Sequence, residues 1–66
     1  MSKKCEIIEY VTPWGTVEYN VWVETNVAGV MCLQRTFKSL EEAQAYVRSR
    51  NLSLLHIYLN TTKEVI

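Results

Sequence analysis

Few residues in this 66-residue chain have side chains suited to catalysis or metal binding. His56 is the single histidine, Cys5 and Cys32 are the two cysteines, and there is no aspartate. A zinc site needs about four closely spaced Cys and His ligands, and this chain could supply no more than these three residues. A Cys–His pair would also lack the third group that orients a catalytic base. With Gly15 and Gly29 as its two glycines, the chain has no glycine-rich phosphate loop. The sequence therefore predicts no enzymatic activity, cofactor or metal site.

The start of the chain predicts a cytoplasmic protein. Met1 to Glu6 contains two lysines, but no apolar stretch follows it, as a secretory signal would require. A reducing compartment favours free thiols, although cysteines on neighbouring strands could form one disulfide. No apolar run approaches the ~20 residues of a membrane span, so no membrane partner is expected.

Composition indicates one small folded domain covering residues 1–66. Seven Lys and Arg balance seven Asp and Glu, with 48% hydrophobic and 21% charged residues. This balance is typical of a folded chain rather than a disordered one. A domain of this size buries only about 60% of its unfolded surface, so its core is small.

Four segments have the composition and alternation of β-strands. They are Lys4 to Val11, Val17 to Thr25, Val30 to Phe37, and Leu54 to Asn60, with Thr61 to Ile66 either extending the last or fraying. Turn-forming residues separate the first three strands at Thr12 to Thr16 and Asn26 to Gly29. These segments predict two consecutive hairpins.

A helix is predicted to begin after Ser39, because Ser39 and Glu42 form a capping-box pattern. Asn51 suits the C-terminal cap. The apolar stripe that should face the sheet contains Leu40, Ala43, Tyr46 and Val47.

The order strand, strand, strand, helix, strand predicts an α+β fold. After the helix the chain should return to lie beside the first strand. We therefore expect a four-stranded, mostly antiparallel sheet of order 4-1-2-3, with one helix packed on one face.

Alternation within the strands assigns their faces. Three groups are expected beneath the helix: Val17, Tyr19, Val21 and Val23 of the second strand; Met31, Leu33, Arg35 and Phe37 of the third; and Leu55, Ile57 and Leu59 of the last. One helix covers only one face of a sheet, so the opposite face must meet water or a partner.

The uncovered face is the candidate binding surface. It should carry Trp22, Leu54, His56 and Tyr58, joined by either Ile8 and Tyr10 or Ile7 and Val11. Glu18, Glu24 and Arg35 are expected at its polar rim, and Trp14 at the hairpin tip is a rival anchor. Tryptophan and tyrosine are enriched in binding hot spots, although they also stabilise cross-strand pairs. A face of this kind predicts protein binding or a homodimer.

A segment of the chain resembles a known DNA-binding fold. Val17 to Arg50, with the step Thr36-Phe37-Lys38-Ser39-Leu40-Glu41-Glu42-Ala43, is similar to the three-strand-plus-helix domains of phage-type integrases and plant ethylene-response factors. The resemblance implies a sheet placed in the DNA major groove. Glu18 and Glu24 oppose this, because phosphate contacts require positive charge.

A second resemblance rests on the size of the chain and its lack of an active site, not on a sequence motif. A chain of this size that begins at its own Met1 and lacks an active site is similar to the small phage and mobile-element proteins that inhibit host machinery, anti-CRISPR proteins among them. The preferred function is therefore a non-enzymatic protein-binding module, with a host factor or defence complex as partner. Nucleic-acid binding and a self-associating structural role are the alternatives.

Overall fold

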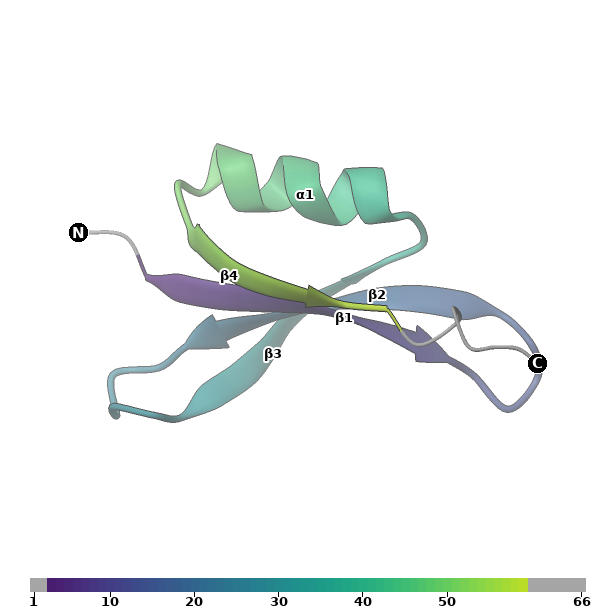
Figure 1. Cartoon of the computed structure of the whole chain (residues 1–66), viewed down its shortest axis with the longest axis horizontal. Coiled ribbons are helices and arrows are strands. Elements are labelled where there is room, and N and C mark those ends of the chain that lie inside the picture. The colour runs from purple at the N-terminus through teal and green to yellow at the C-terminus, as the bar shows by residue number, and fades with distance from the viewer. Residues whose placement is uncertain (1–2, 60–66) are drawn as a thin grey trace.

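The chain folds as a four-stranded sheet with one helix across one of its faces (Figure 1). The computed structural model describes residues 3–59. The elements in chain order are β1 (Lys4–Val11), β2 (Val17–Glu24), β3 (Met31–Phe37), α1 (Leu40–Ser49) and β4 (Ser53–Tyr58). The predicted α+β class and element order are confirmed, whereas Asn60 and Thr61 to Ile66 lie outside the described residues.

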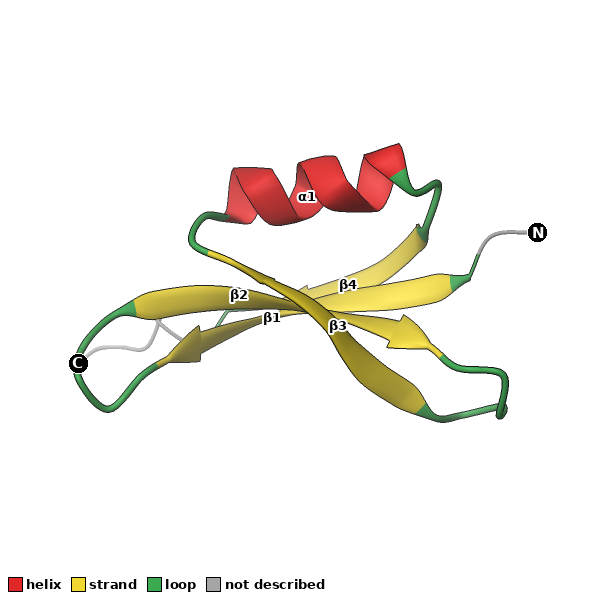
Figure 2. Ribbon diagram, turned by 180° about the vertical axis from the view of Figure 1, so that it is seen from behind, coloured by secondary structure: helices red, strands yellow, loops and turns green. Residues whose placement is uncertain are grey.

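The sheet is mixed rather than mostly antiparallel, which corrects the prediction. β2 runs antiparallel to both β1 and β3, whereas β4 runs parallel to β1 at the sheet edge. The order is β3-β2-β1-β4 (Figure 2); counted from β4, these are the expected neighbours. The parallel pair arises because α1 carries the chain back along the sheet before β4 begins, so β4 repeats the direction of β3.

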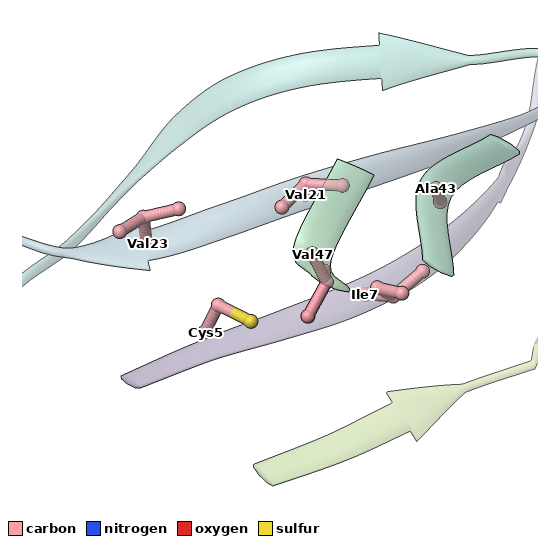
Figure 3. Close-up of a cluster of buried hydrophobic side chains, with 6 residues drawn as sticks. All are labelled: Cys5, Ile7, Val21, Val23, Ala43 and Val47. Atoms are coloured by element: carbon pink, nitrogen blue, oxygen red, sulfur yellow. The ribbon is translucent and has the colours of Figure 1, made fainter. Parts of the chain in front are cut away.

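The core lies between α1 and the two central strands (Figure 3). Its six buried hydrophobic residues are Cys5 and Ile7 of β1, Val21 and Val23 of β2, and Ala43 and Val47 of α1. Tyr19, Phe37, Leu40, Tyr46, Leu52 and Ile57 pack against it while partly exposed. The predicted helix stripe is thereby confirmed, and so is the inner face of β2 at Tyr19, Val21 and Val23, whereas Val17 is not part of this cluster.

Hydrogen bonds fix both ends of α1. The Glu42 amide donates to Ser39 Oγ at 3.2 Å, as predicted for the N-cap. The return bond expected from the Glu42 side chain is not formed within the described residues, so only half of the capping box is present. At the other end, Leu52 N donates to the Val47 carbonyl and Asn51 N to the Arg48 carbonyl, which is a Schellman motif. Asn51 has φ 55°, the left-handed conformation that this motif needs.

Two β-bulges overturn part of the face assignment, and the first is in β3. Arg35 lies opposite Val21 on the helix side, as predicted, but Leu33 lies opposite Trp22 on the other side. The extra residue between them is Gln34. Because side chains alternate along a strand, one inserted residue moves every preceding side chain to the other face. Leu33 is therefore 48% exposed rather than part of the core.

The second bulge is in β4, where Leu55 is the extra residue between Leu54, opposite Cys5, and His56, opposite Glu6. Ile57 packs against the core as predicted. Leu55 is 53% exposed, and Leu59 lies beyond the end of the strand and is also exposed. The predicted burial of Leu55 and Leu59 is therefore wrong.

Candidate functional site

The face of the sheet opposite α1 is uncovered over the described residues (Figure 2). Strand register places two rows of side chains across it, because residues paired across a sheet share a face. The first row is Leu33, Trp22, Glu6 and His56; the second is Thr36, Asn20, Ile8 and Tyr58. We call this surface the open face.

Apolar and aromatic groups form the middle of the open face. Trp22 is half-buried between Leu33 and Glu6. The ring centres of His56 and Tyr58 lie 4.3 Å apart, and the angle between the ring planes is 37°. The two side chains therefore form one aromatic pair along β4. Tyr10 pairs with Glu18 further along β1 and is 46% exposed. Ile8 and Tyr10, rather than Ile7 and Val11, are therefore the β1 residues on this face.

Acidic side chains lie among and beside these apolar groups, with Glu6 between Trp22 and His56. Glu6 and Glu18 lie on the open face through their pairing with Trp22 and Tyr10. Glu24 lies at the end of β2, where its Oε1 accepts a hydrogen bond from the Lys4 backbone amide at 3.3 Å. Lys4, on the same side of β1 as Glu6, adds one positive charge, so acidic side chains outnumber basic ones on the open face although the whole chain is neutral.

Arg35 does not belong to the rim of the open face, which corrects the predicted grouping. Its partner Val21 is buried beneath α1, so Arg35 also projects on the helix side. There its guanidinium carbon lies 5.7 Å from the centre of the Phe37 ring and 5.6 Å from that of Tyr46. The structure therefore separates Arg35 from Trp22 by the thickness of the sheet.

Trp14 is also separate from the open face, because it belongs to the turn between β1 and β2. This turn lies at one end of the sheet (Figure 1). The hairpin turn is firmly held: Thr12 is buried, and its Oγ1 accepts from the Thr16 amide at 3.0 Å. The Gly15 amide donates to the Thr12 carbonyl at 3.0 Å, and Gly15 has φ 91°, which glycine adopts without strain. Trp14 is 76% exposed on this turn. It remains a rival anchor, because β2 runs about 17 Å from Val17, just after this turn, to Trp22.

Two features of the sites were missed from the sequence. Leu33 joins Trp22 on the open face only because of the β3 bulge, which no residue signals. Glu9 is buried on the helix side, where Tyr19 Oη donates to its Oε2 at 2.7 Å. The position of Glu9, two residues after Ile7, could have placed it on the core face. Its hydrogen bond raises the pKa of the Tyr19 hydroxyl, since a carboxylate favours the protonated phenol.

The cysteines and histidine do not form a reactive site. Cys5 is buried, Cys32 is exposed and both are free. Val23 on the intervening strand pairs with each of them, so they lie about 10 Å apart, beyond the ~7 Å limit for a disulfide. Burial, reinforced by Glu6, raises the pKa of the Cys5 thiol and lowers its reactivity. Within residues 3–59, no three His, Cys, Asp or Glu side chains gather closely enough to hold a metal ion.

Comparison with protein-family models, with curated proteins and with solved structures found no match. In the described part of the chain, no helix is long and apolar enough to cross a membrane.

Proposed function

We propose that this protein is a non-enzymatic protein-binding module that engages its partner through the open face. The observation that carries the proposal is the row Leu33–Trp22–Glu6–His56, which brings apolar, aromatic and acidic groups from all four strands onto an uncovered surface. An apolar centre with a charged rim is the usual anatomy of a binding surface. An inhibitor of host machinery, of the phage or mobile-element type, would use such a surface to cover its target.

The charged residues of the open face indicate which side chains its partner should present. Glu6, Glu18 and Glu24 favour a partner that presents Lys or Arg around an apolar side chain. They disfavour nucleic acid, whose phosphates would meet negative charge. The resemblance to DNA-binding sheet domains would need positive charge here, but Arg35 lies on the opposite side.

The same charges disfavour a homodimer formed face to face. A two-fold axis would bring identical glutamates of the two copies together, and like charges across an interface are destabilising. We therefore expect a monomer at neutral pH, which sedimentation equilibrium over a wide concentration range would measure. A stable dimer that Trp22→Ala dissociates would instead favour the self-associating alternative.

A comparative capture experiment tests the proposed function. The wild-type chain, Trp22→Ala and Trp14→Ala are immobilised, and proteins retained from nuclease-treated cell extract are quantified by mass spectrometry. The matched variants remove the same side chain from two surfaces. We expect the wild type and Trp14→Ala to retain the same protein, and Trp22→Ala to lose it, since a central aromatic is worth at least ~2 kcal/mol of binding. Loss with Trp14→Ala alone would move the interface to the hairpin tip.

A further inference from the structure

Two arginines converge on one aromatic ring on the helix side of the sheet. The guanidinium carbon of Arg50, at the end of α1, lies 5.3 Å from the centre of the Tyr46 ring. That of Arg35, from β3, lies 5.6 Å from the same ring. Phe37 extends the cluster, its ring centre 5.4 Å from that of Tyr46. Stacking on aromatic rings holds guanidinium groups in place while their N–H edges remain free to donate.

Within residues 3–59, Arg35 and Arg50 contact aromatic rings rather than a carboxylate. Glu42, one turn before Tyr46 on α1, lines a shallow hollow together with Phe37 and Tyr46. The helix dipole favours a cation at Arg50, but it does not explain why Arg35 approaches the same ring from β3. Of the two arginines, Arg50 lines the groove described next, where its positive charge would be stabilised by an anion.

A groove adjoins the cluster, and the short helix accounts for it. α1 has ten residues and spans about 15 Å, whereas the eight residues of β2 span about 26 Å, so the sheet extends past the end of the helix. β3 begins far from α1 and approaches it only at its end (Figure 2). The resulting groove has a volume of about 780 Å³, which is sufficient for a small organic ligand.

The groove is lined by groups able to bind an anion and its organic part. Tyr46 and Arg50 line it from the helix, and Lys3 adds a second positive charge. Gln34 and Asn51 supply amide groups. Glu24 is the single acidic residue in the lining, and its carboxylate accepts from the Lys4 amide.

We propose that this groove binds a small organic phosphate of nucleotide size. Arg50 and Lys3 bind the phosphate oxygens, and Arg35, which contacts the Tyr46 ring but does not line the groove, adds positive charge nearby. Arginine donates paired hydrogen bonds to phosphate oxygens, and the amides of Gln34 and Asn51 can bind the polar edge of the organic part. This site lies mainly on the helix side of the sheet, and Glu24, at the end of β2, borders both the groove and the open face.

The reactivity of the Cys32 thiol can report ligand binding directly, because Cys32 lines the groove and is exposed, whereas Cys5 is buried. The rate of Cys32 alkylation by iodoacetamide is measured with AMP, with adenosine and with inorganic phosphate. A bound ligand slows alkylation by about 1 + [L]/Kd, or roughly tenfold at ten times Kd. We expect protection by AMP, weaker protection by phosphate at equal concentration, and none by adenosine. Each variant is compared with and without ligand.

The variants distinguish a phosphate site from a merely accessible thiol. Arg50→Gln should abolish protection by AMP, and Arg35→Gln should weaken it. Arg48→Gln, an exposed residue of α1 that does not line the groove, should retain it. Equal protection by adenosine, protection that survives in Arg50→Gln, or no protection at all would overturn the proposal. So would protection by single-stranded DNA alone, which would indicate a nucleic-acid site. Trp22→Ala should retain full protection, so failure of this site and failure of the open face are separable.

Discussion

The two faces of this sheet differ in what their side chains achieve. On the helix side, Ile7 and Val21 are fully buried beneath α1 and belong to the six-residue hydrophobic core. On the open face, the neighbouring residues Ile8 and Trp22 are only half-buried, and Tyr58 is 43% exposed. Because side chains alternate along each strand, one face of the sheet supplies the core that stabilises the fold and the other face remains available for binding. Large side chains that contribute little to the core remain available for a partner.

The largest predicted effect compares adjacent residues of β1. Ile7→Ala should cost about 2–5 kcal/mol because it leaves a cavity in the core. Ile8→Ala, on the open face, should cost about 1 kcal/mol or less. Urea unfolding at neutral pH measures both free energies. Equal losses would contradict the division between the two faces.

The partly buried hydrogen bond between Glu9 and Tyr19 should make the next largest contribution to stability. Tyr19→Phe should cost about 1.5 kcal/mol, the lower end of the range for bonds to charged groups, because Tyr19 is half-exposed. The Tyr19 pKa is raised above its ordinary value of 10.0 in the folded chain. Its contribution is therefore complete below pH 10 and is lost as the pH rises further, when the unfolded state releases its proton first. Unfolding measured from pH 8 to 11 should show a shallower decline in Tyr19→Phe than in the wild type.

Removing the N-cap of α1 should weaken the helix that covers one face of the sheet without changing the open face. Ser39→Ala should cost about 0.5–2 kcal/mol, since the Glu42 amide loses its acceptor, whereas Ser39→Asp restores one. Thermal unfolding followed by circular dichroism would rank the three proteins. Partner binding under folding conditions should be the same in all of them; its loss in Ser39→Ala would implicate α1 in the interface.

The sequence predicts those features of the fold that depend on the chemistry of a few neighbouring residues. The Ser39 cap, the alternation around Val21 and the left-handed Asn51 follow from residue chemistry, and the structure has all three. The bulges at Gln34 and Leu55 follow from the fit of strands brought together by the whole fold, and neither position carries a glycine or another marker. Arg35 follows the β3 bulge and alternates regularly with Phe37, so its position opposite Val21 followed from the alternation. Assigning it to the rim of the open face contradicted that pattern.

The smallest predicted stability effect belongs to the proposed binding centre. Trp22→Ala removes a cross-strand contact with Leu33 and should cost only about 0.2–1 kcal/mol. Urea unfolding would measure it beside Trp14→Ala, which should be close to zero because Trp14 is exposed. A loss as large as that of Ile7→Ala would make Trp22 a core residue and remove the basis for the open face.

The chain contains two tryptophans, one on each rival surface, so their indole N–H signals report directly on the interface. The ¹⁵N-labelled protein is titrated with the partner obtained from the capture experiment, and Trp14→Phe assigns the two signals. If the partner binds the open face, the Trp22 signal shifts or broadens as the partner is added, while the Trp14 signal stays in place. A Trp14 signal that responds while Trp22 does not would contradict it.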